Sequence, residues 1–245
     1  MELITEDEYK RLYGDDHKRL PKLFSVEEHE ADFNTHKLEV LLSKTGLFHR
    51  SLLDALIRFN RTLLKVRELN ASAQAMAAMK EYRSLQQQGE WILSHFENAR
   101  KLVQGYFKRI KKMRDTEGYV AAWISHEKPR FHDPSMHAQY EREVAELTHK
   151  VRLDLHQMIC ILFEMDKFFE DEVVFLKDMV RRQLKRVNDN HFNYAKASGL
   201  LNSMNVKFQG VVEASKKFHK VLDSEKSDLK VRKEMVARAF GVKEE

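Results

Sequence analysis

Histidine and acidic side chains are the residues of this chain best suited to binding a metal ion, but their spacing does not favour a metal site. The sequence has twelve histidines, and none lies in a Cys/His cluster or in a His-Glu-x-x-His motif. Glu146-Leu147-Thr148-His149 has the Glu-x-x-His spacing that di-iron helical bundles place on two helices. Glu27-Glu28-His29-Glu30 only superficially resembles it. A di-iron site would lack its second half, so we expect no metal and no other cofactor.

Cys160 is the single thiol of the chain and its one candidate for cysteine nucleophilic catalysis. It lies in the apolar run Met158–Phe163, whose large side chains predict a small, buried core residue that substrates do not reach. The sequence also has no Gly-x-Ser-x-Gly elbow and no phosphate-binding glycine loop. We therefore expect a non-enzymatic protein. A lone cysteine without a disulfide partner fits a reducing compartment such as the cytoplasm.

Basic residues are the most distinctive polar feature of the sequence. The formal net charge is +5, and residues 98–114 contain seven Lys or Arg and no Asp or Glu. Near an anionic leaflet each such residue contributes about 1 kcal/mol to binding, although solvated helix faces of this composition are common. Recognition motifs for nucleic acid and exposed stacking aromatics are not apparent, so we expect no nucleic-acid partner. The predicted membrane-binding residues are Lys101, Lys108, Arg109, Lys111, Lys112, Arg114, Lys128, Arg130, Arg181, Arg182, Lys185 and Arg186.

Long helices must position these residues, because the chain has only three prolines and eight glycines to interrupt regular structure. Ser25 and Glu28 have the spacing of a capping box, which predicts the start of a helix. Apolar residues then recur at steps of three and four as far as about residue 70. A second amphipathic helix is predicted over residues 73–125.

Two prolines, Pro129 and Pro134, predict a tight turn over residues 126–134, with Asp133 or Ser135 capping a third helix. This helix is predicted to continue to about Leu222, with a bend or break near Ser198–Gly199. Beyond it the charges alternate and fraying is expected. The predicted organisation is an N-terminal appendage with a short helix (1–24), a long-helix domain (25–222) and a charged C-terminal tail (223–245).

The apolar seams of these helices predict how they pack. Apolar residues of the third helix recur with a mean step of about 3.6, as in a nearly straight amphipathic helix. Phe168, Phe169 and Phe175 widen its apolar side, so we expect one side to pack within the chain and the other against a second copy. The predicted fold is all-α: a long, antiparallel three-helix coiled-coil bundle that forms a homodimer. Its predicted core or dimer residues are Phe48, Leu52, Phe59, Met158, Leu162, Met165, Phe168 and Phe169.

Membrane-spanning and secretory segments are not predicted. No apolar run is longer than six residues, whereas spanning a bilayer takes ~20. The acidic N-terminal stretch Met1–Glu8 has neither the basic start nor the apolar middle of a signal peptide. We expect a cytoplasmic protein that associates with membranes peripherally.

The order of these long helices resembles that of BAR domains, and more narrowly those of sorting nexins. Lys128-Pro129 at the second turn is similar to the family pattern. Residues 143–151 (EVAELTHKV) are similar to the start of the family's third helix, and residues 168–177 (FFEDEVVFLK) to its middle. The resemblance covers roughly Phe24 to Leu222.

The resemblance implies an antiparallel dimer whose concave face and helix-tip loops contact anionic lipid through Lys and Arg. It also implies curvature sensing or generation and a role in protein transport at endosomes. No phosphoinositide-binding PX module precedes the helices, and the N-terminal segment is acidic, so headgroup specificity and insertion of an N-terminal helix are not implied. The alternative is a helical coiled-coil adaptor whose basic residues bind an acidic protein partner without binding lipid.

Overall fold

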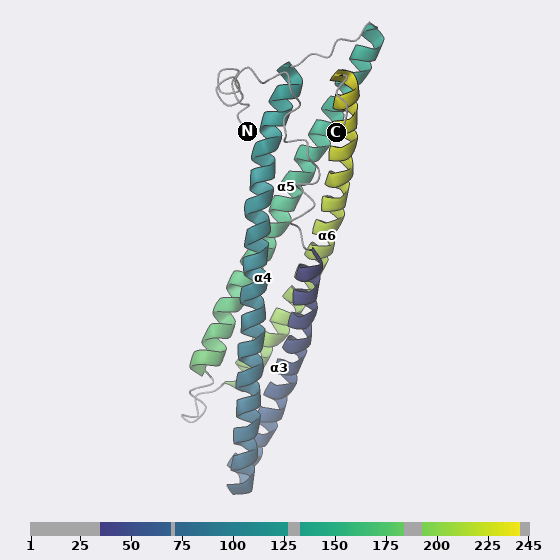
Figure 1. Ribbon diagram of the computed structural model, residues 1–245. Coiled ribbons are helices and arrows are strands. Elements are labelled where there is room, and N and C mark those ends of the chain that lie inside the picture. Colours follow the sequence, from purple (N-terminus) through teal and green to yellow (C-terminus); the bar gives the residue numbers. More distant parts are fainter. Residues whose placement is uncertain (1–34, 70–71, 127–132, 184–192, 241–245) are drawn as a thin grey trace. The chain divides into compact units, whose positions relative to one another are not determined.

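The computed structural model describes residues 35–69, 72–126, 133–183 and 193–240, and the regular structure in these ranges is helical throughout (Figure 1). An all-α chain is therefore confirmed for the described residues. The elements are α3 (Thr35–Leu69), α4 (Ser72–His126), α5 (Pro134–Asp178), the short π-helix η3 (Met179–Gln183) and α6 (Tyr194–Phe240).

The boundaries around α4 and at the start of α5 agree with the sequence prediction. α3 ends at Leu69, α4 covers residues 72–126, and α5 begins at Pro134. The Asp133 Oδ1 accepts hydrogen bonds from the backbone N–H and the hydroxyl of Ser135, both at 2.8 Å. These bonds lower the pKa of Asp133 and satisfy a free donor of the first turn. The predicted capping box at Ser25 lies outside the described residues, as does the N-terminal appendage.

The described residues form four long helices, because the predicted third helix is divided between α5 and α6, so a three-helix bundle is not confirmed. The division precedes Ser198–Gly199. Asn193 stands immediately before α6, and its Oδ1 accepts a hydrogen bond from the backbone N–H of Lys196 at 2.9 Å. Such an N-cap supports a new helix start rather than the continuation of an earlier helix.

The predicted fraying after Leu222 is wrong, because α6 continues to Phe240. This part of α6 has a buried face that includes Val236 and Ala237 but also the charged residues Glu225 and Arg232. Apolar periodicity therefore understates the length of the packed helix.

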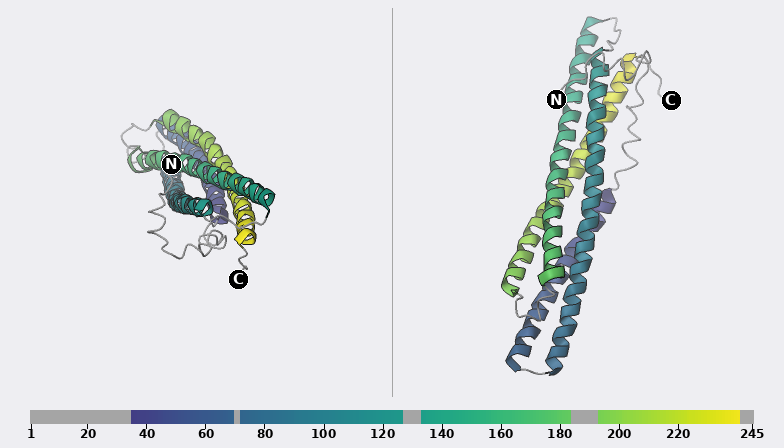
Figure 2. Two further views of the ribbon diagram at one scale, coloured as in Figure 1. Left: turned by 90° about the horizontal axis from the view of Figure 1, so that it is seen from above. Right: turned by 90° about the vertical axis from the view of Figure 1, so that its left-hand side faces the viewer.

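Contacts divide the chain into two units, which are described separately (Figure 2 gives two further views of the helices). Among the described residues, unit 1 contains 105–126, 133–162 and 217–240, and unit 2 contains 35–69, 72–104, 163–183 and 193–216. Within the described residues, unit 1 is built from parts of α4, α5 and α6, whereas unit 2 contains α3 as well.

In unit 2, α3 and the first part of α4 run antiparallel. The ring of Phe48 lies 5.4 Å from that of Trp91, and the ring of Phe59 lies 6.0 Å from that of Tyr82. Later residues of α3 therefore lie beside earlier residues of α4, as expected for antiparallel helices. The two-residue connection at 70–71 agrees with this arrangement, because short links join antiparallel neighbours.

The centre of unit 2 is an aromatic cluster around Phe96 of α4. Its ring lies 6.0 Å from Phe168, 5.7 Å from Phe169 and 6.4 Å from Phe208. Phe96 and Phe169 are fully buried. The cluster joins α4, α5 and α6 in one core. Its contacts, edge-to-face with Phe168 and Phe169 and stacked with Phe208, add to the free energy gained by burying the rings.

Gly89 of α4 allows a close approach to η3 in the same unit. Gly89 is buried, and a Cβ atom built on it would overlap the Cγ2 atom of Val180. Any larger residue at position 89 would force α4 and η3 apart or displace the Val180 side chain.

In unit 1, α4 and α6 run parallel. Tyr106 stacks on Phe218 with ring centroids 5.9 Å apart, and further along both helices Glu117 forms an ion pair with Arg232. Later residues of α4 therefore lie beside later residues of α6, as expected for parallel helices.

α5 runs antiparallel to α6 in the same unit. Lys150 pairs with Asp228, and one turn later on α5 the carboxylate of Asp154 accepts a hydrogen bond from the Ser224 hydroxyl. Charged groups from three helices are thus brought to one level of unit 1.

Candidate functional site

Three lysines of the predicted basic cluster lie on one exposed face of α4 in unit 1. Lys108, Lys111 and Lys112 are three and four residues apart, which places their side chains on the same side of the helix. All three are exposed, and none pairs with an acidic side chain in the part of the chain that the structure describes. We call these three residues the lysine face.

Two further lysines, on α6, were not predicted from the sequence. Lys217 and Lys220 are exposed and have no acidic partner among the described residues. Because Tyr106 stacks on Phe218 and the two helices run parallel, these lysines lie at the level of Lys108 along unit 1. Their acidic neighbours in the sequence, such as Asp223, conceal them from a search for stretches of a single charge.

Two arginines of the α4 cluster, Arg109 and Arg114, are less available than the lysine face. Lys101 is exposed but belongs to unit 2. Arg109 is partly buried, and this desolvation lowers its pKa. Arg114 donates a hydrogen bond from Nη2 to Asp115 at 3.2 Å. A count of charges along one helix therefore overstates the positive charge that a partner would meet.

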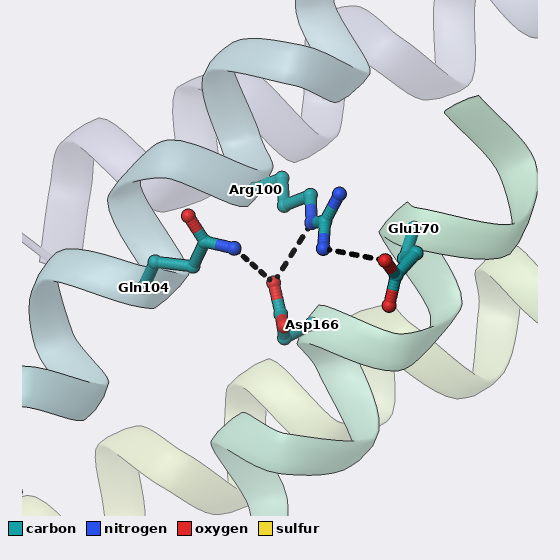
Figure 3. Close-up of polar contacts among 4 residues, drawn as sticks. All are labelled: Arg100, Gln104, Asp166 and Glu170. Carbon is teal, nitrogen blue, oxygen red and sulfur yellow. Dashed lines mark hydrogen bonds and ion pairs between the residues drawn. The ribbon is translucent and has the colours of Figure 1, made fainter. Parts of the chain in front are cut away.

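Arg100 of α4 is a further base whose charge is neutralised by acidic side chains, which in this case belong to the neighbouring helix α5 (Figure 3). Its Nε donates to the Asp166 Oδ1 at 3.1 Å, and its Nη2 lies 3.0 Å from the Glu170 Oε1. Gln104 donates to the same Asp166 oxygen at 3.1 Å. Desolvation would lower the pKa of Arg100, but the bonds and charges of the two carboxylates raise it overall. α5 thus neutralises a base that stands in an acid-free stretch of α4.

The second predicted basic cluster lies at η3 in unit 2 and is also partly neutralised. Arg181 is 3.9 Å from Glu90 and Arg182 is 3.6 Å from Asp178, and both arginines are exposed. Pairs this exposed contribute little to stability and leave the arginines accessible. The other predicted membrane-binding residues, Lys128, Arg130, Lys185 and Arg186, lie outside the described residues.

Most of the predicted core residues are buried in the chain itself, while their predicted role in a dimer stays a prediction. Phe48 and Phe168 remain partly exposed. The Phe48 ring stacks on that of His95 at 4.9 Å, next to the exposed Trp91. The buried members are Leu52, Phe59, Met158, Leu162, Met165 and Phe169.

The prediction that Cys160 is a core residue is wrong, because its side chain is exposed. Six successive apolar residues cover more than one full turn of α5, so they cannot all face the core. Met158 and Leu162 take the buried positions, while Phe163 is 61% exposed. The Cys160 Sγ lies 3.8 Å from the His156 Nε2, which is also on the exposed side.

A groove of about 470 Å³ lies between α4 and α5 in unit 1. Tyr140 is buried beside it, and this burial raises the pKa of its phenol to about 12, so the hydroxyl stays protonated at neutral pH. His149 of the predicted Glu-x-x-His motif lines the groove, but no group of three His, Cys, Asp or Glu in the described ranges is arranged to hold a metal. The other polar side chains of its lining are Ser125, Glu141, Thr148 and Arg152.

A group of buried charges in unit 1 is the feature that sequence reasoning missed. The terminal nitrogens of Arg232 reach both carboxylate oxygens of Glu117, at 2.5 and 2.7 Å, and these side chains are 1% and 4% exposed. The Lys150 Nζ lies 2.9 and 2.8 Å from the two carboxylate oxygens of Asp228. We call these four residues, together with Asp154 and Glu225, the buried charge cluster. Lys150 is the exception to the burial, because its side chain is 54% exposed.

The two remaining carboxylates of this cluster are less well satisfied. Burial raises the pKa of Asp154, against the effect of the hydrogen bond from Ser224. Glu225 is 1% exposed, and its Oε2 has no hydrogen-bond partner among the described residues. One sequence signal does exist: Glu225 and Arg232 continue the spacing of Phe218 and Leu222, so charged residues occupy positions of an apolar seam.

In the described part of the chain, no helix combines the length and apolar character needed to cross a membrane. Comparisons of the chain with protein-family models, with curated proteins and with solved structures return no match.

Proposed function

We propose that the protein is a non-enzymatic, dimeric helical scaffold that binds anionic membrane surfaces and senses or generates their curvature. The lysine face carries this proposal. Lys108, Lys111 and Lys112 are exposed close together on one side of α4, and none of them has an acidic partner among the described residues. Three unpaired like charges this close repel one another, so an anionic surface that neutralises them is favourable.

The expected strength of the interaction follows from the number of lysines. At about 1 kcal/mol per basic residue, the lysine face would contribute about 3 kcal/mol per chain, or roughly 100-fold in affinity. Lys217 and Lys220, at the same level of unit 1, would add to it. A dimer would present each set twice, which strengthens binding without new contacts.

Exposed apolar side chains on α5 support the dimer in this proposal. Phe163 is 61% exposed, and Val174 of the same helix is 64% exposed. Single exposed apolar residues are ordinary, but α5 is the helix whose wide apolar side predicts contact with a second copy. The mass of the protein in solution tests this part. Two chains per particle are expected, with dissociation on changing Phe163→Glu, and a monomer at all concentrations would contradict the proposal.

Co-sedimentation with vesicles tests lipid binding. The wild type is expected to bind vesicles that contain anionic lipid, to ignore neutral ones, and to bind less as salt is raised, because screening shortens the reach of the lysines. Replacing Lys108, Lys111 and Lys112 together by Gln should reduce binding strongly.

The matched control for that triple variant changes Lys177, Lys207 and Lys216 to Gln. These lysines are partly exposed but already paired with Glu97, Glu172 and Glu213. The control variant has the same net charge and should keep most of the binding. Equal losses in the two variants would mean that net charge, rather than the lysine face, drives the interaction. Vesicles of different diameters then test preference for curvature.

The second candidate is a helical adaptor that binds an acidic protein and no lipid. Trp91 favours it, because this side chain is 46% exposed beside Phe48, and exposed Trp is enriched at protein interfaces. A stable dimer that ignores anionic vesicles at low salt would support the adaptor over the membrane scaffold.

A further inference from the structure

The buried charge cluster of unit 1 contains more acidic than basic groups. α4 supplies Glu117, α5 supplies Asp154 and Lys150, and α6 supplies the remaining three members. With every group ionised, the cluster would hold four negative and two positive charges. Burying unbalanced charge is costly, so a cluster of this composition is expected to adjust its protonation.

The basic and hydroxyl groups of the cluster are directed at three of the four carboxylates. Arg232 contacts Glu117 with both terminal nitrogens, Lys150 contacts Asp228, and the Ser224 hydroxyl donates to Asp154. Glu225 is the exception. Its Oε2 is buried without a hydrogen-bond partner in the described residues, while the Oδ2 of Asp154 is also unpartnered.

Charged groups from every helix packed around Glu225 act on its carboxyl group. Glu117 of α4 and Asp154 of α5 repel its charged form, whereas Arg232 and Lys226 of α6 attract it. Burial is the largest effect, followed by the repulsion from Glu117, and together they raise the pKa of Glu225 to about 8. An unpartnered carboxyl at this position is therefore easier to bury with its proton than without it.

We propose that the buried charge cluster is a proton-binding site, in which Glu225 takes up one proton when unit 1 folds and releases it as the pH rises, weakening the packing of α6 against α4 and α5. The step is a simple acid dissociation: the carboxylic acid O–H bond breaks, the proton passes to water, and a carboxylate remains. This site is independent of the lysine face and of any partner.

The direction of the effect follows from proton linkage. In the unfolded chain Glu225 has its ordinary pKa near 4.5, whereas in the folded chain it titrates near 8. Between these values the folded state binds the extra proton, so the stability of unit 1 is highest at low pH and falls as the pH rises through this window. Above about pH 8 the loss is complete.

The test measures urea unfolding of the full chain from pH 6 to pH 9. For the wild type, the folding equilibrium constant of unit 1 is expected to fall by roughly 100-fold over this range through Glu225 alone. Glu225→Gln keeps the shape of the side chain and cannot titrate, so it should lack this contribution. Glu213→Gln is the control, because it makes the same change at an exposed position of α6.

Proton release supplies a second readout. Unfolding the wild type at pH 7 should release about one proton that unfolding Glu225→Gln does not. If Glu225→Gln does not fold, infrared spectra of the wild type with labelled glutamate decide the matter, since a protonated carboxyl band present at pH 6 should vanish by pH 9. Identical pH profiles for the wild type and Glu225→Gln, or the absence of that band, would overturn the proposal.

Discussion

Arg232 and Glu117 form a two-point ion pair inside unit 1, in which both terminal nitrogens of the guanidinium meet both oxygens of the carboxylate. These two residues lie far apart in the sequence, on α6 and α4, and both side chains are almost fully buried. The planar fork of Arg matches a carboxylate in a way that Lys cannot. The pair therefore fixes the register between two parallel helices.

Removing one partner of this pair should be strongly destabilising. Arg232→Ala leaves Glu117 buried without its counter-ion, and such losses cost about 3–5 kcal/mol. Urea unfolding measures the effect. Arg238→Ala is the control, because Arg238 is exposed and pairs with Glu234 at 3.7 Å, and it should cost about 1 kcal/mol or less. Similar costs for the two variants would contradict the structural role of the buried pair.

Gly89 and Gly105 should respond in opposite ways to the same substitution. Gly89→Ala introduces a methyl group that overlaps Val180, and overpacking of this kind typically costs about 1–3 kcal/mol. Nothing lies within 4 Å of a Cβ built on Gly105, so Gly105→Ala should raise stability by up to about 1 kcal/mol through helix propensity. Thermal unfolding of both variants shows whether each substitution lowers or raises the stability of the protein. A stabilising Gly89→Ala would mean that α4 and η3 are less closely packed.

Those parts of the fold that depend on local signals could be predicted from the sequence. Pro134 and the capping Asp133 mark the start of α5, and apolar periodicity predicts α3 and α4, whereas the predicted turn before α5 lies mostly outside the described residues. The start of α6 was predicted a few residues late, near Ser198–Gly199, because its local signal is a single N-cap, Asn193. Periodicity reports which residues can be buried, and it does not report where a helix stops.

The candidate site was less predictable, because charge pairing is a property of neighbouring helices. Arg100 stands in an acid-free stretch of α4, yet α5 supplies Asp166 and Glu170 to it. In contrast, Glu225 and Arg232 occupy buried positions that hydrophobicity alone assigns to solvent. Single-helix patterns give the identity of the charged residues, but only the packing of α4, α5 and α6 determines which charges remain available.

His49 should make unit 2 less stable in mild acid. Its side chain is buried, and desolvation lowers its pKa below the ordinary value of 6.5, despite a hydrogen bond to the backbone of Leu201. The unfolded chain therefore binds more protons just below pH 6.5, and stability falls as the pH drops through this range, by up to about 1.4 kcal/mol per pH unit. Above pH 6.5 the contribution is constant.

Unfolding measured at pH 5.5 and pH 7.5 isolates the effect of His49. The free energy of unfolding should differ less between the two pH values in His49→Leu than in the wild type. The variant His36→Leu, changed at an exposed position of α3, should show the same difference as the wild type. Glu225 has the opposite pH dependence, so the comparison of variants is needed rather than the wild-type curve alone. An unchanged difference in His49→Leu would exclude His49 as the source of acid sensitivity.

Phe96 should be among the largest contributors to the stability of unit 2. Its ring contacts Phe168, Phe169 and Phe208, and truncating a fully buried Phe to Ala costs about 3–5 kcal/mol through lost burial and the cavity that remains. In dilute, monomeric protein Phe163→Ala is the matched control, because Phe163 is 61% exposed in the single chain and its truncation there should change the free energy of unfolding by less than about 0.5 kcal/mol. Measured above the concentration at which the chains associate, a loss in Phe163→Ala approaching that of Phe96→Ala would show that Phe163 is buried by a second chain. The same loss in dilute, monomeric protein would contradict its exposed position on α5.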